Sequence, residues 1–215
     1  MKTKSILFIV ALALLAGSCI PSLFPLYTKD DIIFDSRIEG VWDAGIDYIG
    51  IWTIERLEHH SGFDFMNPSW TEPDEDTDTG NIKYRLTIHQ LVGTDTVEAE
   101  FLMHLLNLGE YMYMNIHPQD YELQHGFLSW HMIEANTFMR VNIQNDSFEI
   151  RAFDPGFLGN LIEENKIRID HMSFGGILLT APTKDLQKFV LKYSDEEGAL
   201  FEPDVLKKIG PVPGS

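Results

Sequence analysis

Residues 81–106 carry the pattern that most constrains the fold of this chain. Apolar and polar residues alternate from 81 to 91 and again from 96 to 106, which is the period-2 pattern of two half-buried strands. Between them, Gly93-Thr94-Asp95 is a turn signal. The segment therefore predicts a β-hairpin with one face towards a core.

One register of this hairpin satisfies both of its faces. Pairing Leu91 with Thr96 places apolar side chains opposite each other on one face and His or Thr opposite Glu on the other. The apolar pairs are Ile88 with Ala99, Leu86 with Phe101, and Tyr84 with Met103. The polar pairs are His89 with Glu98 and Thr87 with Glu100, and Arg85 lies diagonal to Glu100. We expect this register in the folded protein.

Further short strands are indicated on both sides of the hairpin. They are residues 50–57, 111–117, 127–130, 138–144, 147–153 and 176–180. Asp154-Pro155 predicts the start of a first helix, and an apolar stripe after Pro182 predicts a second helix near the C-terminus. The chain after Pro203 is expected to be a frayed tail. The fold class predicted is mainly β, an antiparallel meander or barrel with two short helices.

The N-terminus has the anatomy of a secretory signal. Lys2 and Lys4 precede an apolar run over residues 6–15, which is shorter than the roughly 20 residues that span a bilayer. Ala16-Gly17-Ser18-Cys19 follows and resembles the lipobox of bacterial lipoproteins. The resemblance implies diacylglyceryl transfer to the Cys19 sulfur and cleavage after Ser18. The alternative is an ordinary signal peptide followed by an incidental cysteine.

Lipidation of Cys19 would fix the location of the protein. Two or three acyl chains such as palmitate give permanent membrane anchoring. Residue 20 is Ile rather than Asp, so the inner-membrane retention signal is missing, and in a Gram-negative cell an outer-membrane location, on the periplasmic face or at the surface, is favoured. The organisation expected is a signal peptide (1–18), a lipidated Cys19 with an extended leader (19–35), one β-rich domain (36–202) and a tail (203–215).

Two resemblances concern the globular part. Gly40-Val41-Trp42 resembles the entry to lipocalin-like barrels, in which the Trp closes one end. Most of the mature chain resembles a group of uncharacterised bacterial lipoproteins, a resemblance that implies no activity and no site. The segments that carry this second resemblance are Pro25-Leu26-Tyr27-Thr28, Phe34-Asp35, Gly40-Val41-Trp42, residues 137–141 and residues 179–187.

Charge restricts the partners of the protein. The chain has a formal charge of −17, and removal of Lys2 and Lys4 leaves 14 basic against 33 acidic residues, a net charge of −19. Such a field repels nucleic acid and anionic headgroups. The partners expected are the lipid bilayer through acylated Cys19 and either a small apolar ligand or an envelope protein. With one cysteine, the mature domain has no disulfide of its own.

No motif predicts a cofactor, a metal site or a catalytic residue. Asp74, Asp76 and Asp78 alternate, but the following Gly80 and Arg85 do not fit the spacing of an EF-hand, so a solvated acidic loop is favoured over a weak calcium site. The eight histidines lack H-x-x-x-H and H-x-H spacings, and Gly-x-Ser-x-Gly is absent from the sequence.

The barrel interior is the candidate site. Aromatic and Met side chains at strand spacing could line a pocket, although they more commonly form a filled core. The candidates for ligand binding are Tyr84, Phe101, Met103, Tyr113, Trp130 and Phe138. The loop 61–80, with Phe63, Phe65, Met66 and Trp70 among acids, is either a recognition element or a cover for one end of the barrel.

Three functions follow as hypotheses. The favoured one is a non-enzymatic, membrane-anchored envelope lipoprotein that binds a small apolar ligand or a partner protein. A dry, aromatic pocket would support it. The first alternative is an envelope hydrolase, which needs a pocket with a carboxylate and a histidine. The second is a structural subunit of an envelope complex, which needs an exposed apolar patch and no pocket.

Overall fold

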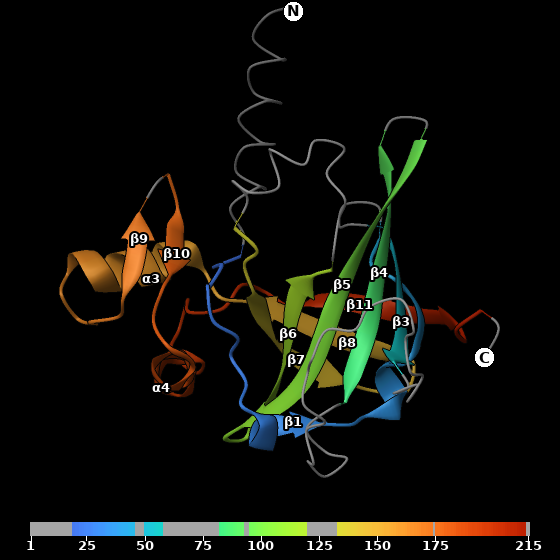
Figure 1. Cartoon of the computed structure of the whole chain (residues 1–215), viewed down its shortest axis with the longest axis horizontal. Helices are drawn as coiled ribbons and strands as arrows, with labels where there is room; N and C mark the ends of the chain where they lie inside the picture. Colours follow the sequence, from blue (N-terminus) through green and yellow to red (C-terminus); the bar gives the residue numbers. More distant parts are fainter. Residues whose placement is uncertain are drawn as a thin grey trace, which may run out of the picture.

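A closed, eight-stranded antiparallel barrel forms the centre of the protein (Figure 1). The computed structural model describes residues 19–45, 50–57, 82–92, 95–119, 133–173 and 175–213. The barrel strands are β2 (Gly40–Asp43), β3 (Ile51–Leu57), β4 (Lys83–Val92), β5 (Asp95–Leu108), β6 (Tyr111–Pro118), β7 (Thr137–Ile143), β8 (Ser147–Ala152) and β11 (Asp204–Gly210). Each pairs with the next, and β11 pairs with β2 to close the ring. This meander confirms the mainly β class and is consistent with a lipocalin-like fold.

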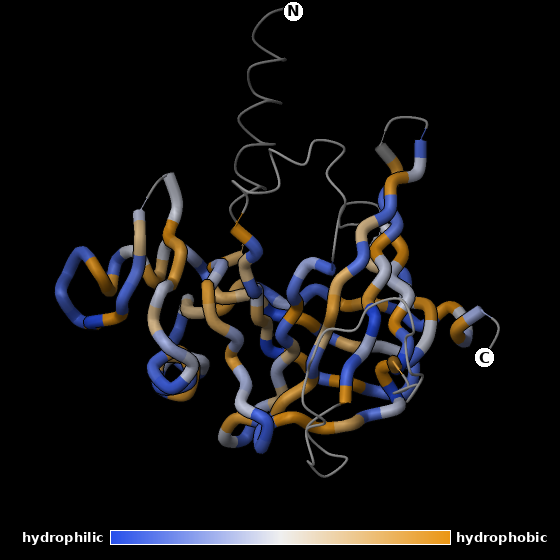
Figure 2. The backbone as a smooth tube through the Cα atoms, in the orientation of Figure 1, coloured by the Kyte–Doolittle hydropathy of each residue, from blue (hydrophilic) through white to orange (hydrophobic). Residues whose placement is uncertain are grey.

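The predicted hairpin is confirmed residue by residue. In β4 and β5, Ile88 pairs with Ala99, Leu86 with Phe101 and Tyr84 with Met103, and His89 lies opposite Glu98. The His89 Nδ1 to Glu98 Oε2 distance is 3.3 Å. Arg85, however, pairs with Glu55 on the neighbouring strand β3, at 2.7 Å. The alternation is visible along the barrel strands in Figure 2.

The tail expected after Pro203 is instead the eighth barrel strand. β11 pairs with β8 through Leu206–Phe148 and with β2 through Lys208–Trp42. Leu206 is its single fully buried side chain among the described residues, which is why the segment lacks a strand pattern. Gly40-Val41-Trp42, expected just before the first strand, itself forms β2. The predicted strand 127–130 lies outside the described residues.

The chain between β8 and β11 forms a layer beside the barrel, at the left in Figure 1. It contains α3 (Pro155–Glu163), β9 (His171–Ser173), β10 (Ile177–Leu179) and α4 (Thr183–Tyr193). Both predicted helices are therefore present. The Asp154 side chain caps α3 by accepting the Gly156 backbone N–H at 2.7 Å, and Pro182 precedes α4.

The barrel wall separates two apolar cores. The inner core lies inside the barrel and includes Trp42, Trp52, Leu86, Met103 and Phe148. The outer core lies between the wall and the helical layer, and it includes Tyr113, Phe138, Phe153, Leu186 and Phe189. All described residues of the two cores lie between Ile20 and Leu206, so a chain that begins at Cys19 retains both.

The leader runs between the barrel and the helical layer (Figure 1). Its first residues are held by backbone hydrogen bonds between Ser22 and Asn136 and between Leu23 and Leu179. Leu26 is fully buried, and its N–H donates to Asn115 Oδ1 at 3.0 Å. The leader continues through η1 (Lys29–Asp31), β1 (Ile32–Ile33), which pairs with β5, and η2 (Ser36–Ile38).

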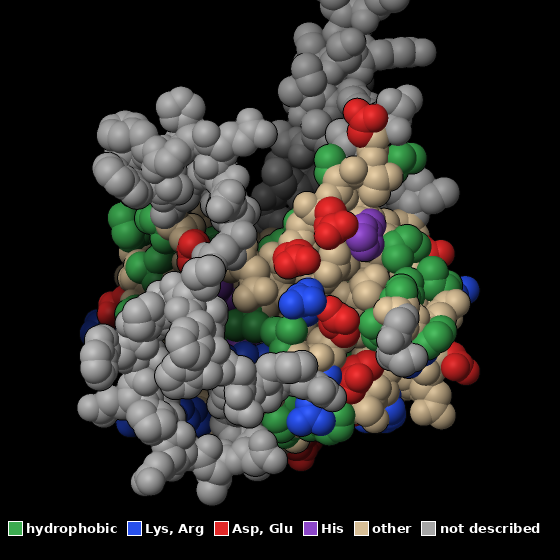
Figure 3. All heavy atoms as spheres, turned by 45° about the vertical axis from the view of Figure 1, so that its right-hand side comes forward, with side chains coloured by type: hydrophobic (Ala, Val, Ile, Leu, Met, Phe, Trp, Pro, Cys, Tyr) green, Lys and Arg blue, Asp and Glu red, His purple; other side chains and the backbone are tan. Residues whose placement is uncertain are grey.

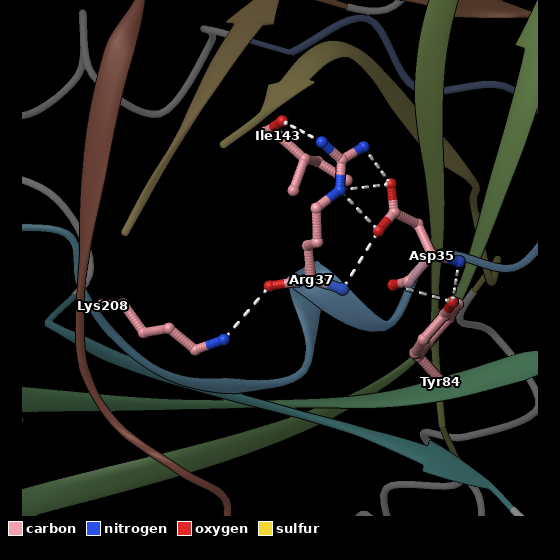
Figure 4. Close-up of polar contacts among 5 residues, drawn as sticks. All are labelled: Asp35, Arg37, Tyr84, Ile143 and Lys208. Carbon is pink, nitrogen blue, oxygen red and sulfur yellow. Dashed lines mark hydrogen bonds and ion pairs between the residues drawn. The ribbon is translucent and has the colours of Figure 1, made fainter. Parts of the chain in front are cut away.

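One end of the barrel is closed by residues 35–38, which we call the basal plug. Ile38 is fully buried, and its carbonyl accepts the Trp42 indole N–H at 2.8 Å. The Arg37 guanidinium binds both Asp35 carboxylate oxygens and donates to the Ile143 carbonyl (Figure 4). The Tyr84 hydroxyl accepts the Asp35 N–H at 2.9 Å, and Lys208 Nζ donates to the Arg37 carbonyl. The plug is thus tied to β4, β7 and β11.

Candidate ligand-binding cavity

An apolar cavity of about 360 Å³ lies at the end of the barrel opposite the basal plug, which we call the mouth. Its apolar wall comes from inward positions on six strands, β3 to β8. These include Trp52, Phe101, Ile116, Met139, Ile150 and Ala152. Four polar residues, Gln90, Glu98, Thr137 and Asp204, and one further residue, Cys19, also border it. Its volume falls within the roughly 300–1,000 Å³ of small-molecule pockets.

The cavity exists because the inward side chains become smaller towards the mouth. Near the plug, Trp42, Tyr84 and Phe148 fill the cross-section, and Phe148 packs edge-on against Trp42 with ring centroids 4.8 Å apart. Near the mouth, Ala99 and Ala152 take inward positions and leave space. An eight-stranded barrel has room either for packed side chains or for one small ligand. In this barrel, side chains fill the end near the basal plug, and the end at the mouth has space for a ligand.

Among the apolar wall residues, Trp52 is the one whose polar hydrogen has no acceptor in the described part of the chain. Its side chain is 2% exposed, and Nε1 is buried without a hydrogen-bond partner in this part of the chain. A buried donor without an acceptor costs roughly 1–3 kcal/mol. A ligand oxygen could satisfy this donor. Its position beside an apolar space suits a molecule with a long apolar part and few polar atoms.

The border of the cavity is acidic. Glu98 and Asp204 contribute carboxyl groups, and partial burial raises the pKa of Asp204 above its usual value. The outer wall carries more acids: in the view of Figure 3, Asp and Glu side chains are spread over the wall and the projecting β4–β5 ribbon. An anionic ligand would meet repulsion from this border. Neutral ligands are favoured.

Cys19 lies at this mouth and is tightly positioned. The next residue, Ile20, is 4% exposed and belongs to the outer core. Ser22 exchanges two backbone hydrogen bonds with Asn136, each 2.8 Å long, and Leu179 N–H donates to the Pro21 carbonyl at 2.9 Å. The leader therefore holds Cys19 against the barrel, with no free linker between them.

The sequence-based candidates lie in several places. Phe101 borders the cavity. Tyr84 and Met103 are fully buried deeper in the inner core. Tyr113 and Phe138 face the other way, into the outer core, where the Tyr113 hydroxyl lies 2.9 Å from Ser194 Oγ. Trp130 and the loop 61–80 lie outside the described residues.

Sequence reasoning missed most of the wall of the cavity. In β7 the residues that face the barrel interior are Met139, Val141 and Ile143. Phe138 lies on the opposite face of the strand and belongs to the outer core. β6 is buried on both faces from Tyr113 to Ile116, and such a strand gives no alternation to read, whereas β7 does alternate. The available signal was Met139 with Val141 and Ile143, which share a face.

A second, larger cavity lies outside the barrel wall and is polar. It has a volume of about 510 Å³ and is bordered by Arg37, Arg140 and Arg151 together with Glu110 and Glu149. Each arginine already has a partner: Arg37 binds Asp35, Arg140 binds the Ser194 carbonyl, and Arg151 binds the Phe201 carbonyl. Size alone favours this cavity, but its cations are occupied, so we place the candidate site at the mouth.

No group of three or more His, Cys, Asp or Glu side chains in the described ranges is arranged to hold a metal ion. Asp74, Asp76 and Asp78 lie outside these ranges, as do four of the histidines. His104 is described and sits on the outer face of β5, 3% exposed, with its ring centroid 4.3 Å from that of Tyr27. Burial lowers the pKa of His104 to about 4. It does not border the cavity.

Comparisons with known proteins suggest no function for this chain. No family model, no curated protein and no solved structure matches this chain. Among the described helices, none is long and apolar enough to cross a membrane. The fold and the mouth cavity are therefore the observations from which a function can be argued.

Proposed function

We propose that this protein is a membrane-anchored envelope lipoprotein that binds one small, neutral, apolar ligand in the mouth of its barrel. The lipobox-like segment that ends at Cys19 and the resemblance to uncharacterised bacterial lipoproteins support the anchor. In a Gram-negative cell, the absence of Asp at residue 20 supports an outer-membrane location.

The observation that carries the binding proposal is the mouth cavity. Its wall is formed by apolar side chains on six strands, and it includes Trp52, whose buried indole N–H has no acceptor in the described part of the chain. Pockets for small molecules typically combine an apolar wall with a few polar groups that fix orientation. The lining described contains no histidine, which favours binding over the hydrolase alternative.

The charge at the border selects the class of ligand. Glu98 and Asp204 disfavour a carboxylate or phosphate at the mouth, in agreement with the net charge of the chain. A free fatty acid is therefore a poor ligand at neutral pH. A neutral acyl ester has the same hydrocarbon chain and offers a carbonyl oxygen to the Trp52 indole. We take neutral acyl esters as the preferred class.

The test is a binding titration on the unlipidated chain from residue 19 onwards, with Cys19→Ser. The neutral dye N-phenyl-1-naphthylamine reports occupancy of the cavity by its fluorescence, and a monoacylglycerol competes with it. Ala152→Trp places a large side chain in the cavity, whereas Val205→Trp places the same side chain on an exposed position of β11.

The proposal expects saturable dye binding that monoacylglycerol displaces and palmitate displaces poorly at pH 7.5. Ala152→Trp should weaken binding at least tenfold, and Val205→Trp should leave it unchanged. Both variants are first checked for cooperative unfolding. Equal dye binding by the two folded variants, or no saturable binding by the parent chain, would exclude a ligand site at the mouth.

A further inference from the structure

We propose that the mouth cavity takes up one acyl chain of the protein's own lipid anchor, so that the anchor is the resident ligand. This inference rests on the proposed function and names the occupant of the same cavity. The first observation is that Cys19, the residue that would carry the acyl groups, itself borders the cavity. A chain attached to its sulfur starts at the entrance of the site.

The leader keeps the attachment point there. Ile20 is buried in the outer core, and the backbone at Pro21, Ser22 and Leu23 is hydrogen-bonded to the segments around Asn136 and Leu179. A ligand held this close has a high effective concentration at its site, and it competes strongly with any free molecule. Binding of the anchor in cis therefore needs only modest intrinsic affinity.

The chemistry of the wall fits an ester-linked chain. The hydrocarbon part would lie against Phe101, Ile116 and Met139, and an ester carbonyl at the entrance would be an acceptor for the Trp52 indole N–H. A diacylglyceryl group carries no charge, so the carboxyl groups of Glu98 and Asp204 do not oppose its entry.

The volume limits how much of the anchor can enter. At about 360 Å³, the cavity lies near the lower end of the range for small-molecule pockets and accommodates one chain rather than several. The remaining acyl chains stay available to the bilayer. Since stable anchoring takes two membrane signals, capture of one chain weakens the hold of the membrane on the protein. The cavity thus offers a protected place for a chain while the protein is away from lipid.

A single cysteine makes the test chemically clean. The unlipidated chain from residue 19 onwards carries one thiol, which can be alkylated with N-hexadecyl iodoacetamide or, as the short control, with iodoacetamide. Both products receive the same amide link and differ only in the hydrocarbon. The same two products are prepared from the Ala152→Trp chain, whose cavity is filled, and from the Val205→Trp chain.

Two readouts separate this inference from the proposed function. The first is binding of N-phenyl-1-naphthylamine, which the short control should bind and the hexadecyl product should bind at least tenfold more weakly. The second is direct: in methyl-labelled protein, nuclear Overhauser effects should join the hexadecyl methylenes to the Met139 methyl, assigned with Met139→Leu. Val205→Trp should keep these effects, and Ala152→Trp should abolish them.

The outcomes decide each claim. Loss of dye binding on hexadecylation together with contacts to Met139 supports docking in cis. Equal dye binding by the short and hexadecyl products, with no contact to Met139, overturns it while leaving the proposed ligand site intact. A short control that binds no dye overturns the proposed function, and the contacts to Met139 then still decide whether the anchor enters the cavity. Association of the hexadecyl product into micelles with an empty cavity, seen by light scattering, also overturns docking.

Discussion

Cys19 and Trp52 border the same cavity at the mouth of the barrel, although Cys19 begins the leader and Trp52 lies on the second barrel strand, β3. The leader makes this possible: its backbone is hydrogen-bonded and Ile20 is buried, so Cys19 is held against the wall. A lipid attached at Cys19 would therefore orient the mouth, and not the plugged end, towards the membrane.

Trp52→Phe tests whether the indole N–H serves the ligand. Phe retains an aromatic ring at the wall and removes a donor that has no acceptor among the described residues. Loss of one hydrogen bond, about 1 kcal/mol, should weaken monoacylglycerol binding about fivefold. Binding of diphenylhexatriene, a conjugated hydrocarbon dye that has no hydrogen-bond acceptor atom, should be unchanged. Equal losses for both ligands would show that Trp52 acts only by filling space.

His104 should make the protein sensitive to mild acid. Burial, followed by the charges of Lys83 and His117, lowers the pKa of His104 from 6.5 to about 4 in the folded protein. The unfolded chain therefore binds the proton first, and stability that is present above pH 6.5 is lost as the pH falls towards 4. The cost at pH 4 is roughly 3 kcal/mol, from a shift of about 2.5 units at 1.36 kcal/mol each.

The variant His104→Phe separates this effect from the titration of carboxylates. Phe has a similar size, stacks on Tyr27 and cannot ionise. Chemical unfolding of both proteins at pH 7 and pH 4 should show that His104→Phe loses markedly less stability on acidification. Parallel losses in the two proteins would mean that His104 is accessible to water in the folded state.

Asp35 should stabilise the basal plug in two separable ways. Its Oδ1 accepts the Arg37 backbone N–H at 3.0 Å, which caps η2, and its carboxylate pairs with the Arg37 guanidinium. Asp35→Ala removes both and should cost about 1–2 kcal/mol in thermal or chemical unfolding. Asp35→Asn retains the cap acceptor and should cost less. If the two variants are equally destabilised, the cap is not the important contact.

Asp35 also predicts acid sensitivity at lower pH. Hydrogen bonding to Arg37 is the largest influence, and it lowers the pKa of Asp35 below its usual 3.8. Its stabilising contribution is therefore present above that pH and is lost as the pH falls through the lowered pKa. Asp35→Asn should flatten the stability profile below pH 4 relative to the parent protein, measured at constant ionic strength. An unchanged profile would contradict the ion pair.

The C-terminal strand offers a deletion test of the barrel. Removal of residues 204–215 takes away β11 and leaves β2 and β8 without a shared partner. We expect loss of cooperative unfolding, because the inner core also loses Leu206. The matched deletion of residues 213–215 should leave the unfolding temperature unchanged. A cooperative, parent-like transition after the longer deletion would mean that the barrel does not need β11.

The sequence predicted the parts of the fold where burial is one-sided. The β4–β5 register follows from alternation on both faces, and each predicted pair from Ile88–Ala99 to Tyr84–Met103 is present. The strand β11 was not predicted, because only Leu206 is fully buried among its described residues and because Lys207 and Lys208 interrupt any apolar run. Such a strand forms because it pairs with β2 and β8, and its own sequence does not show the alternation by which a strand is predicted.

The site was harder to predict than the fold. Tyr113 and Phe138 look like residues of a barrel interior, but they lie on the outer face of β6 and β7, where the outer core buries them as fully as the barrel interior would. The mouth cavity depends on small residues, Ala99 and Ala152, whose effect is space rather than a pattern. Its proximity to Cys19 depends on the path of the leader across the wall.

Native mass spectrometry on the unlipidated Cys19→Ser chain incubated with a monoacylglycerol tests the central claim most directly. The account predicts one bound monoacylglycerol per protein, retained in the Val205→Trp variant and lost in the Ala152→Trp variant. No adduct with the parent chain, or the same adduct in all three proteins, would contradict a ligand site at the mouth of the barrel.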